Sequence, residues 1–169
     1  MLVFRCEWAH NPAISGWTVL PTIEYSVTVP AAVDEAFRVF QNLDRLLGRG
    51  IYEQIVWIEG EPWRAGSRLR YEILQPRRAT MTAVVTAISP PRSIELLNHA
   101  LGVTAEQHVS FGPDLRGGTR IRSTLTLVGK PTELSETEAR EATAFLLHDA
   151  LDTIAALCQR SRASSAPGM

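Results

Sequence analysis

The last part of the chain is a long segment with helical periodicity, and it constrains the fold more than any other feature. Ser135 and Glu138 form a capping box that predicts where the helix begins, and the pattern continues to about residue 162. One apolar stripe follows the helix: Thr143, Leu146, Leu147, Ala150, Ile154, Leu157 and Cys158. Such a helix is about 40 Å long. It is therefore long enough to lie across an entire sheet.

Strands fill most of the sequence before this helix. Residues 22–29 alternate apolar and polar side chains, as a half-buried strand does, and Pro30 ends the pattern. A helix is predicted within 31–43, with a short one at 44–47. Further strands are predicted at 52–59, 67–74, 78–89, 92–100, 103–111 and 119–129. The short spacers favour antiparallel hairpins, so the predicted class is α+β.

Several stretches carry a resemblance to a known superfamily. They are VTVPAAVDEAFRVFQNL, EGEPWRAGSRLRYEI, SPPRSIEL, GPDLRGGTRIRSTLTL and the terminal helix. Over residues 22–159 the chain resembles the START and birch-pollen-allergen (SRPBCC) superfamily, in its branch of polyketide cyclase/dehydrase and lipid-transport proteins. The resemblance implies a helix-grip fold, in which a curved antiparallel sheet wraps the long helix and leaves a cavity. Many relatives carry a Trp soon after the first helix, where this chain has LDRLLGRGIYEQ, so the cavity wall there is expected to differ.

Length and composition indicate one domain with two short flanking segments. We expect an N-terminal extension at 1–21, the ligand-binding domain at 22–162 and a disordered tail at 163–169. The net charge of −1 argues against nucleic acid as a partner, and no apolar run is long enough to insert into a membrane. Cys6 and Cys158 are expected to be free thiols in the cytoplasm, although a disulfide between them is conceivable.

A predicted hairpin around Leu101-Gly102 sorts a cluster of polar side chains onto two faces. In this register Asn98 faces Ala105 and Leu96 faces Gln107, whereas Glu95 faces His108 and His99 faces Thr104. The face of Asn98 and Gln107 is otherwise apolar. We therefore expect these two amides to point inward and both histidines to point toward solvent.

The inward polar groups are the predicted handles for a ligand. The same alternation turns Tyr25, Tyr71 and Ser123 inward. The complete predicted ligand-binding set is Tyr25, Tyr71, Asn98, Gln107, Ser123, Leu146, Ala150 and Ile154. The alternative is that the polar members satisfy one another in a filled core, because a buried unpaired amide costs about 1–3 kcal/mol.

The strand at 52–59 allows two orientations. With Val56 and Ile58 inward, Glu53 lies in solvent, and this is the orientation that we favour. With Trp57 inward, Glu53 would enter the cavity with a raised pKa and could act as an acid or base.

Three functions are compatible with these patterns. The leading hypothesis is binding of a hydrophobic or amphipathic small molecule, without a cofactor or a metal ion. The alternative is an enzyme resembling polyketide aromatase/cyclases, which would need an ionisable inward group beyond the tyrosines and amides. The third is an interaction module that dimerises through Phe145 on the long helix.

Overall fold

The computed structural model describes residues 22–129 and 131–165. The elements are β1 (Thr22–Val29), α1 (Val33–Gln41), the 3₁₀ helix η1 (Leu43–Leu46), β2 (Tyr52–Glu59), β3 (Arg68–Ile73), β4 (Ala79–Ser89), β5 (Ser93–Ala100), β6 (Val103–Pro113), β7 (Thr119–Val128) and α2 (Glu136–Ser165). The predicted extension at 1–21, with Cys6, lies outside the described residues.

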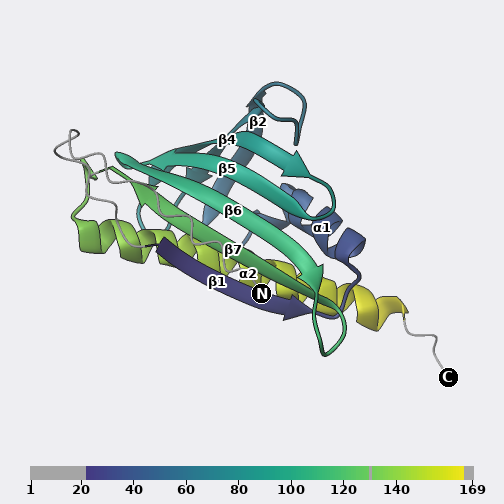
Figure 1. The fold of residues 1–169 in the computed structure, drawn as a ribbon. Helices are drawn as coiled ribbons and strands as arrows, with labels where there is room; N and C mark the ends of the chain where they lie inside the picture. The colour runs from purple at the N-terminus through teal and green to yellow at the C-terminus, as the bar shows by residue number, and fades with distance from the viewer. Residues whose placement is uncertain (1–21, 130, 166–169) are drawn as a thin grey trace, which may run out of the picture.

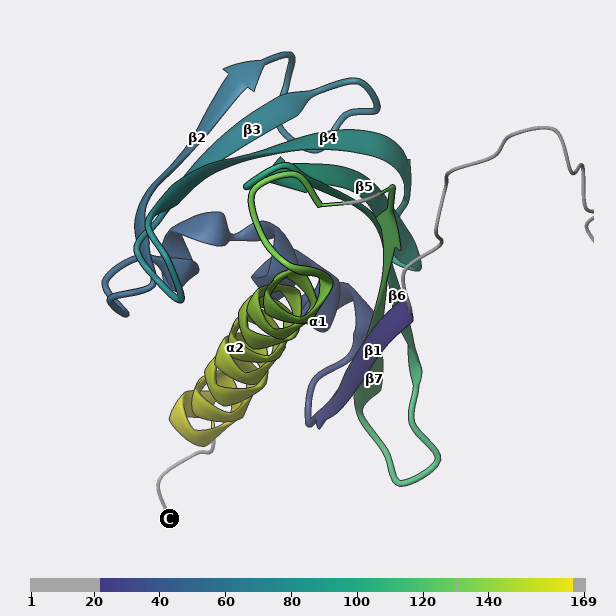
Figure 2. The same cartoon turned by 90° about the vertical axis from the view of Figure 1, so that its left-hand side faces the viewer.

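A single antiparallel sheet of seven strands forms one layer of the molecule. The strand order is β1-β7-β6-β5-β4-β3-β2, so the first strand joins the sheet beside the last one. The sheet curves around α2, which lies across its concave face (Figures 1 and 2). The predicted α+β class and helix-grip architecture are thus confirmed. Among the described residues, no helix is long and apolar enough to cross a membrane.

The β5–β6 hairpin has the predicted register. Asn98 pairs with Ala105, Leu96 with Gln107, and Glu95 with His108. Leu101 and Gly102 form the turn with φ values of 51° and 68°. Positive φ at both central residues gives a turn whose twist matches that of the flanking strands, which is why the short connection holds this register.

The predicted orientation of β2 is wrong. Ile55 and Trp57 pack into the interior, whereas Ile58 is 49% exposed. The reason is an irregularity in the pairing with β3 between Tyr52 and Gln54, because an extra residue in a strand reverses the alternation beyond it. Glu53 lies in solvent as predicted, and its carboxylate is 2.9 Å from a guanidinium nitrogen of Arg78.

The capping box of α2 is present as predicted. Ser135 donates from its amide and its hydroxyl to the Glu138 carboxylate, at 2.9 and 2.7 Å, and the Glu138 amide donates to the Ser135 hydroxyl at 3.2 Å. At its other end α2 continues to Ser165, so it includes the first three residues of the tail predicted at 163–169. The sequence there contains Arg162 and Ala163, which are good helix formers.

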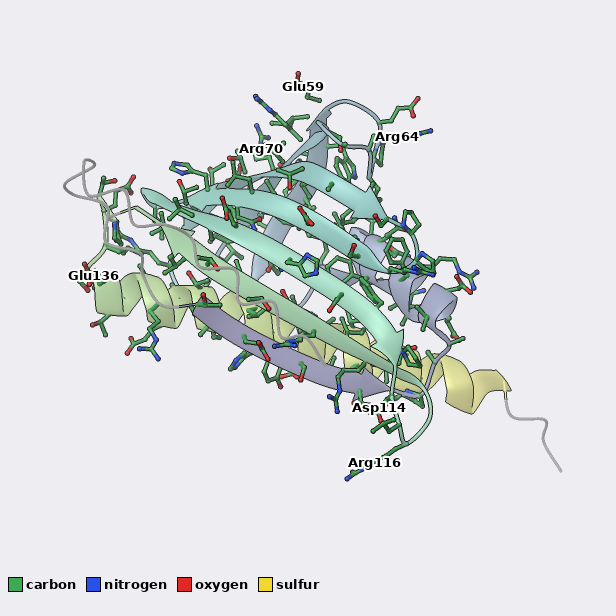
Figure 3. All side chains as sticks on the ribbon, viewed as in Figure 1. Glu59, Arg64, Arg70, Asp114, Arg116 and Glu136 are labelled. Carbon is green, nitrogen blue, oxygen red and sulfur yellow. The ribbon has the colours of Figure 1, made fainter. Side chains whose placement is uncertain are left out.

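Charged side chains lie on the outside of the molecule. Figure 3 shows Glu59 and Arg64 pointing away from the body beside the turn after β2, and Arg116 pointing away from the turn between β6 and β7. Arg120 and Arg122 of β7 are exposed and pair with Asp114 and Glu24. The polar face of the sheet is thus convex, which leaves the concave face to the apolar side chains.

Candidate functional site

A cavity lies between the concave face of the sheet and α2. Its volume is about 140 Å³. The walls are mainly apolar, with side chains from the sheet such as Leu96 and Leu125, and with Leu146, Ala150 and Ile154 of α2. These three helix residues belong to the predicted ligand-binding set. The cavity is therefore where the resemblance placed it, between the sheet and the long helix.

A chain of three polar side chains crosses the floor of the cavity. Asn98 Nδ2 donates to Gln107 Oε1 at 3.0 Å, and Gln107 Nε2 donates to Ser123 Oγ at 3.0 Å. Three adjacent strands supply the three residues, so the sheet register sets their spacing. Asn98 and Gln107 line the cavity, whereas Ser123 is 0% exposed and lies beneath Gln107, outside the lining. Each amide thus keeps a partner without a ligand, which makes these groups tolerable in an apolar interior.

Two tyrosines form part of the wall near β2 and β3. Tyr71 was predicted and Tyr52 was not, and their ring centroids lie 5.9 Å apart. Burial raises the pKa of both hydroxyls well above the ordinary value, and the charge of Asp149 raises the pKa of Tyr52 further. Both are therefore neutral and can donate hydrogen bonds. Tyr52 lies on the face that the favoured orientation of β2 turned inward, and the irregularity after it is what allows Ile55 and Trp57 to point inward as well.

An acidic side chain that the sequence analysis did not single out lies behind Tyr52. Asp149 Oδ1 accepts a hydrogen bond from Arg49 at 2.9 Å, and its side chain is 13% exposed. Within the described part of the chain, the buried Oδ2 has no hydrogen-bond partner. Asp149 precedes Ala150 of the apolar stripe, so its place at the edge of that stripe is the signal that could have drawn attention to it. Asp149 thus has one carboxylate oxygen without a hydrogen-bond partner among the described residues, and the residue lies outside the cavity lining.

Tyr25 lies apart from the other predicted ligand-binding residues. Its hydroxyl donates to Asp152 Oδ1 at 2.8 Å, and its ring centroid is 4.0 Å from that of His148. The hydrogen bond to Asp152, together with partial burial and the charge of that residue, raises the Tyr25 pKa. The structure therefore uses Tyr25 to attach β1 to α2 and not to line the cavity.

The region near the first helix has an aromatic wall that the sequence analysis did not foresee. Trp63, in the loop between β2 and β3, and Phe40, in α1, both line the cavity, with ring centroids 6.2 Å apart. Trp63 Nε1 donates to the Gln41 carbonyl at 3.0 Å. The sequence GEPWRAG indicates only a turn, and tertiary packing brings its Trp to α1.

The histidines lie on the outside, as predicted. His99 is 3.1 Å from the Thr104 hydroxyl, and His108 is 3.6 Å from Glu95. In the part of the chain that the structure describes, no group of three or more His, Cys, Asp or Glu side chains is arranged to hold a metal ion.

Sequence comparison identifies no relative. No family model matches the chain. A comparison with curated proteins finds no match either.

Comparison with solved structures finds the same fold. Ara h 8.0201 superposes with a TM-score of 0.68 at 13% identity, over 83% of this chain and 99% of that one. The Zhui aromatase/cyclase from Streptomyces sp. R1128 superposes with a TM-score of 0.69 at 18% identity, over 89% of this chain and 99% of that one. A norcoclaurine synthase point mutant from Thalictrum flavum, in complex with a transition-state analogue, superposes with a TM-score of 0.63 at 16% identity, over 86% of this chain and 98% of that one. At these identities the similarity extends to the fold alone. The resemblance to the START and birch-pollen-allergen superfamily thus holds for the architecture.

Proposed function

We propose that the protein binds a hydrophobic or amphipathic small molecule in the cavity between the sheet and α2. The observation that carries this proposal is an apolar cavity whose wall contains a few fixed polar groups, Tyr52, Tyr71, Asn98 and Gln107. Apolar burial supplies about 25 cal/mol for each Å² of surface removed from water. The polar groups orient the ligand, as in most small-molecule sites. The transition-state analogue held by the norcoclaurine synthase supports the idea that this fold accepts small molecules.

Native mass spectrometry of the purified protein tests this proposal. We expect an excess mass over the apo protein, and an apolar compound that is released on denaturation. Ala150→Phe fills the cavity from α2 and should abolish the excess mass. Glu141→Phe is the matched control, because Glu141 is exposed on the same helix and does not line the cavity. If both variants retain the bound compound equally, the compound binds outside this cavity.

Gln107→Leu tests the orienting role of the amides. Removing this amide should weaken binding of a ligand that carries a neutral polar group inside the cavity about tenfold, which corresponds to the loss of one hydrogen bond of about 1.4 kcal/mol. The variant should remain folded, since the substituted side chain is apolar and of similar size. An unchanged affinity would show that Gln107 serves the protein interior alone.

A second candidate function is catalysis on a molecule held in the same cavity. It is favoured by Asp149, whose carboxylate acts electrostatically on the cavity-lining Tyr52 and could serve an acid–base reaction through that hydroxyl, although Asp149 itself does not line the cavity. Two of the similar structures are an aromatase/cyclase and a synthase. The compounds that the wild type and the Asp149→Asn variant release on denaturation discriminate between the two functions. An enzyme should yield two chemically different compounds, and a carrier should yield the same one.

We also propose that the protein is cytoplasmic and forms a homodimer. Cys158 is buried and is a free thiol, which agrees with a reducing cytoplasm. Phe145 is 39% exposed on α2 and is the proposed centre of a homodimer contact. Phe145→Glu should make the mass in sedimentation independent of concentration if the wild type dimerises.

A further inference from the structure

We infer that the ligand carries an anionic group, such as a carboxylate, that binds Arg77 at the mouth of the cavity. This inference rests on the proposed binding function and names the chemical class of its ligand.

The position of Arg77 in the cavity wall is the first observation. Among the described residues that line the cavity, Arg77 is the only charged one. It belongs to the turn between β3 and β4, next to Pro76. Leu101 in the β5–β6 turn and Leu134 just before α2 line the same cavity. Two loops of the sheet and the beginning of α2 therefore meet at one end of the cavity. Arg77 is exposed, so this end opens to solvent.

The free guanidinium of Arg77 is the second observation. Neighbouring arginines are engaged: Arg78 with Glu53, Arg70 with Glu72 and Arg49 with Asp149. No carboxylate of the described residues lies within 4.0 Å of Arg77. A planar guanidinium without a partner can form two parallel hydrogen bonds with a carboxylate.

Glu138, an acidic group that Arg77 influences, is already committed to another contact. Hydrogen bonds from Ser135 hold the pKa of Glu138 below its ordinary value, and the charge of Arg77 lowers it further. The Glu138 oxygen that accepts these hydrogen bonds caps α2. Arg77 thus experiences a carboxylate at a distance but is not neutralised by direct contact. An anion arriving at the mouth finds a donor that forms no ion pair with any residue the structure describes.

The distribution of polar groups then defines how the ligand lies. The interior beyond Arg77 is apolar, with Leu96, Leu125 and Leu146 on opposite walls. A carboxylate would lose its hydration if it were placed there, and the neutral tyrosines and amides would not offset that cost. The stable orientation puts the anion at the mouth on Arg77 and the apolar body inside.

Octanoate and 1-octanol provide a matched pair of probes for isothermal titration calorimetry. They share an alkyl chain and differ in the charge of the head group. We expect wild-type protein to bind octanoate about tenfold more tightly than 1-octanol. Arg77→Gln should remove this preference by weakening octanoate alone. Raised salt should weaken octanoate binding to the wild type and leave 1-octanol unaffected, because only the charged pair is screened.

Arg78→Gln is the matched control, because Arg78 is the adjacent arginine, pairs with Glu53 and does not line the cavity. It should bind both probes as the wild type does. Equal affinity of the wild type for both probes overturns the inference and leaves the cavity proposal intact. Equal weakening of both probes by Arg77→Gln also overturns it, since Arg77 would then shape the mouth. If neither probe binds the wild type, the proposed function is contradicted along with the inference.

Discussion

The two halves of α2 carry one continuous apolar stripe, but they meet different surroundings. In the second half, Thr153 and Cys158 are at most 2% exposed and do not line the cavity. In the first half, Ala142 and Leu146 are only half-buried and line the cavity. The first half of the helix therefore covers the cavity, which reaches as far as Ile154, and the end of the second half closes against a packed core. The difference lies in what the rest of the fold places opposite each half.

Aromatic side chains fill the core around the second half. The ring of Phe111 packs edge-to-face against Phe37 and Phe40 of α1, with centroids 5.1 and 5.4 Å apart. Burial, and to a lesser degree the charge of Glu35 in α1, raises the pKa of the Cys158 thiol to about 11. Glu35 of α1 therefore lies close enough to this end of α2 to act on Cys158. The cavity wall also contains aromatic side chains, but several of its residues are small, namely Ala100, Ala105, Ala139 and Ala142. These small side chains leave room for the cavity.

The largest expected effect comes from truncating a fully buried side chain of α2. Leu151→Ala should lower the free energy of unfolding by about 2–5 kcal/mol, because Leu151 is 1% exposed and packs in the main core, although it also reaches the cavity. Leu146→Ala should cost less than about 1.5 kcal/mol, since Leu146 is half-buried and already borders empty space. Urea unfolding of both variants gives the comparison. Equal losses would mean that the cavity is closed in solution.

Alkaline pH should separate the cavity wall from the rest of the molecule. The folded-state pKa values of Tyr52 and Tyr71 are raised by burial, so their contribution to stability is complete below the ordinary tyrosine pKa. Above about pH 10 the unfolded chain ionises these tyrosines and the folded chain does not. At one pH unit above this value, the suppressed ionisation of each of the two tyrosines should lower the free energy of unfolding by about 1.4 kcal/mol. Urea unfolding across this range measures the loss. Tyr71→Phe should reduce the loss by about 1.4 kcal/mol at about pH 11, whereas the contributions of Tyr25 and Cys158, whose pKa values are also raised, should remain. An identical pH dependence in that variant would refute the assigned burial.

The polar chain beneath the cavity should show coupling between its members. Gln107→Leu leaves Asn98 and Ser123 without the partner each has now, and should cost about 1–3 kcal/mol. Asn98→Leu combined with Gln107→Leu should cost less than the sum of the single variants, because the double variant leaves no amide unpaired between β5 and β6. A double-mutant cycle from denaturant unfolding measures this, and strict additivity would argue against the hydrogen bond.

The smallest effect is expected at the beginning of α2. Ser135→Ala removes the hydroxyl that contacts Glu138 and should lower Tm by roughly 2–4 °C, as the loss of a helix cap does. The change lies at the cavity end of the helix, so it should leave the filled half unaffected. Hydrogen exchange should therefore increase in the first turns of α2 only. Faster exchange throughout the helix would mean that its two halves unfold together.

Local patterns were sufficient for the hairpin and the cap, and insufficient for β2 and Tyr25. The register of β5 and β6 follows from a short turn and strict alternation, so Asn98 and Gln107 could be placed correctly. In β2, one irregular pairing with β3 allows Trp57 to point inward together with Tyr52, and no local residue pattern marks that event. Alternation turned Tyr25 toward the helix correctly, but only packing against Asp152 and His148 sets it outside the cavity.

By itself, the sequence determined the element order, the fold class, the apolar stripe of α2 and the faces of the central hairpin. These properties depend on residues a few positions apart, whose spacing follows the helix or strand period. Tertiary structure alone decided that Asp149 lies behind Tyr52, that Trp63 joins Phe40 in the wall and that Arg77 reaches the mouth. Those residues come from loops and from distant elements. Their meeting depends on how a curved sheet closes over a helix, which no periodicity along the chain encodes.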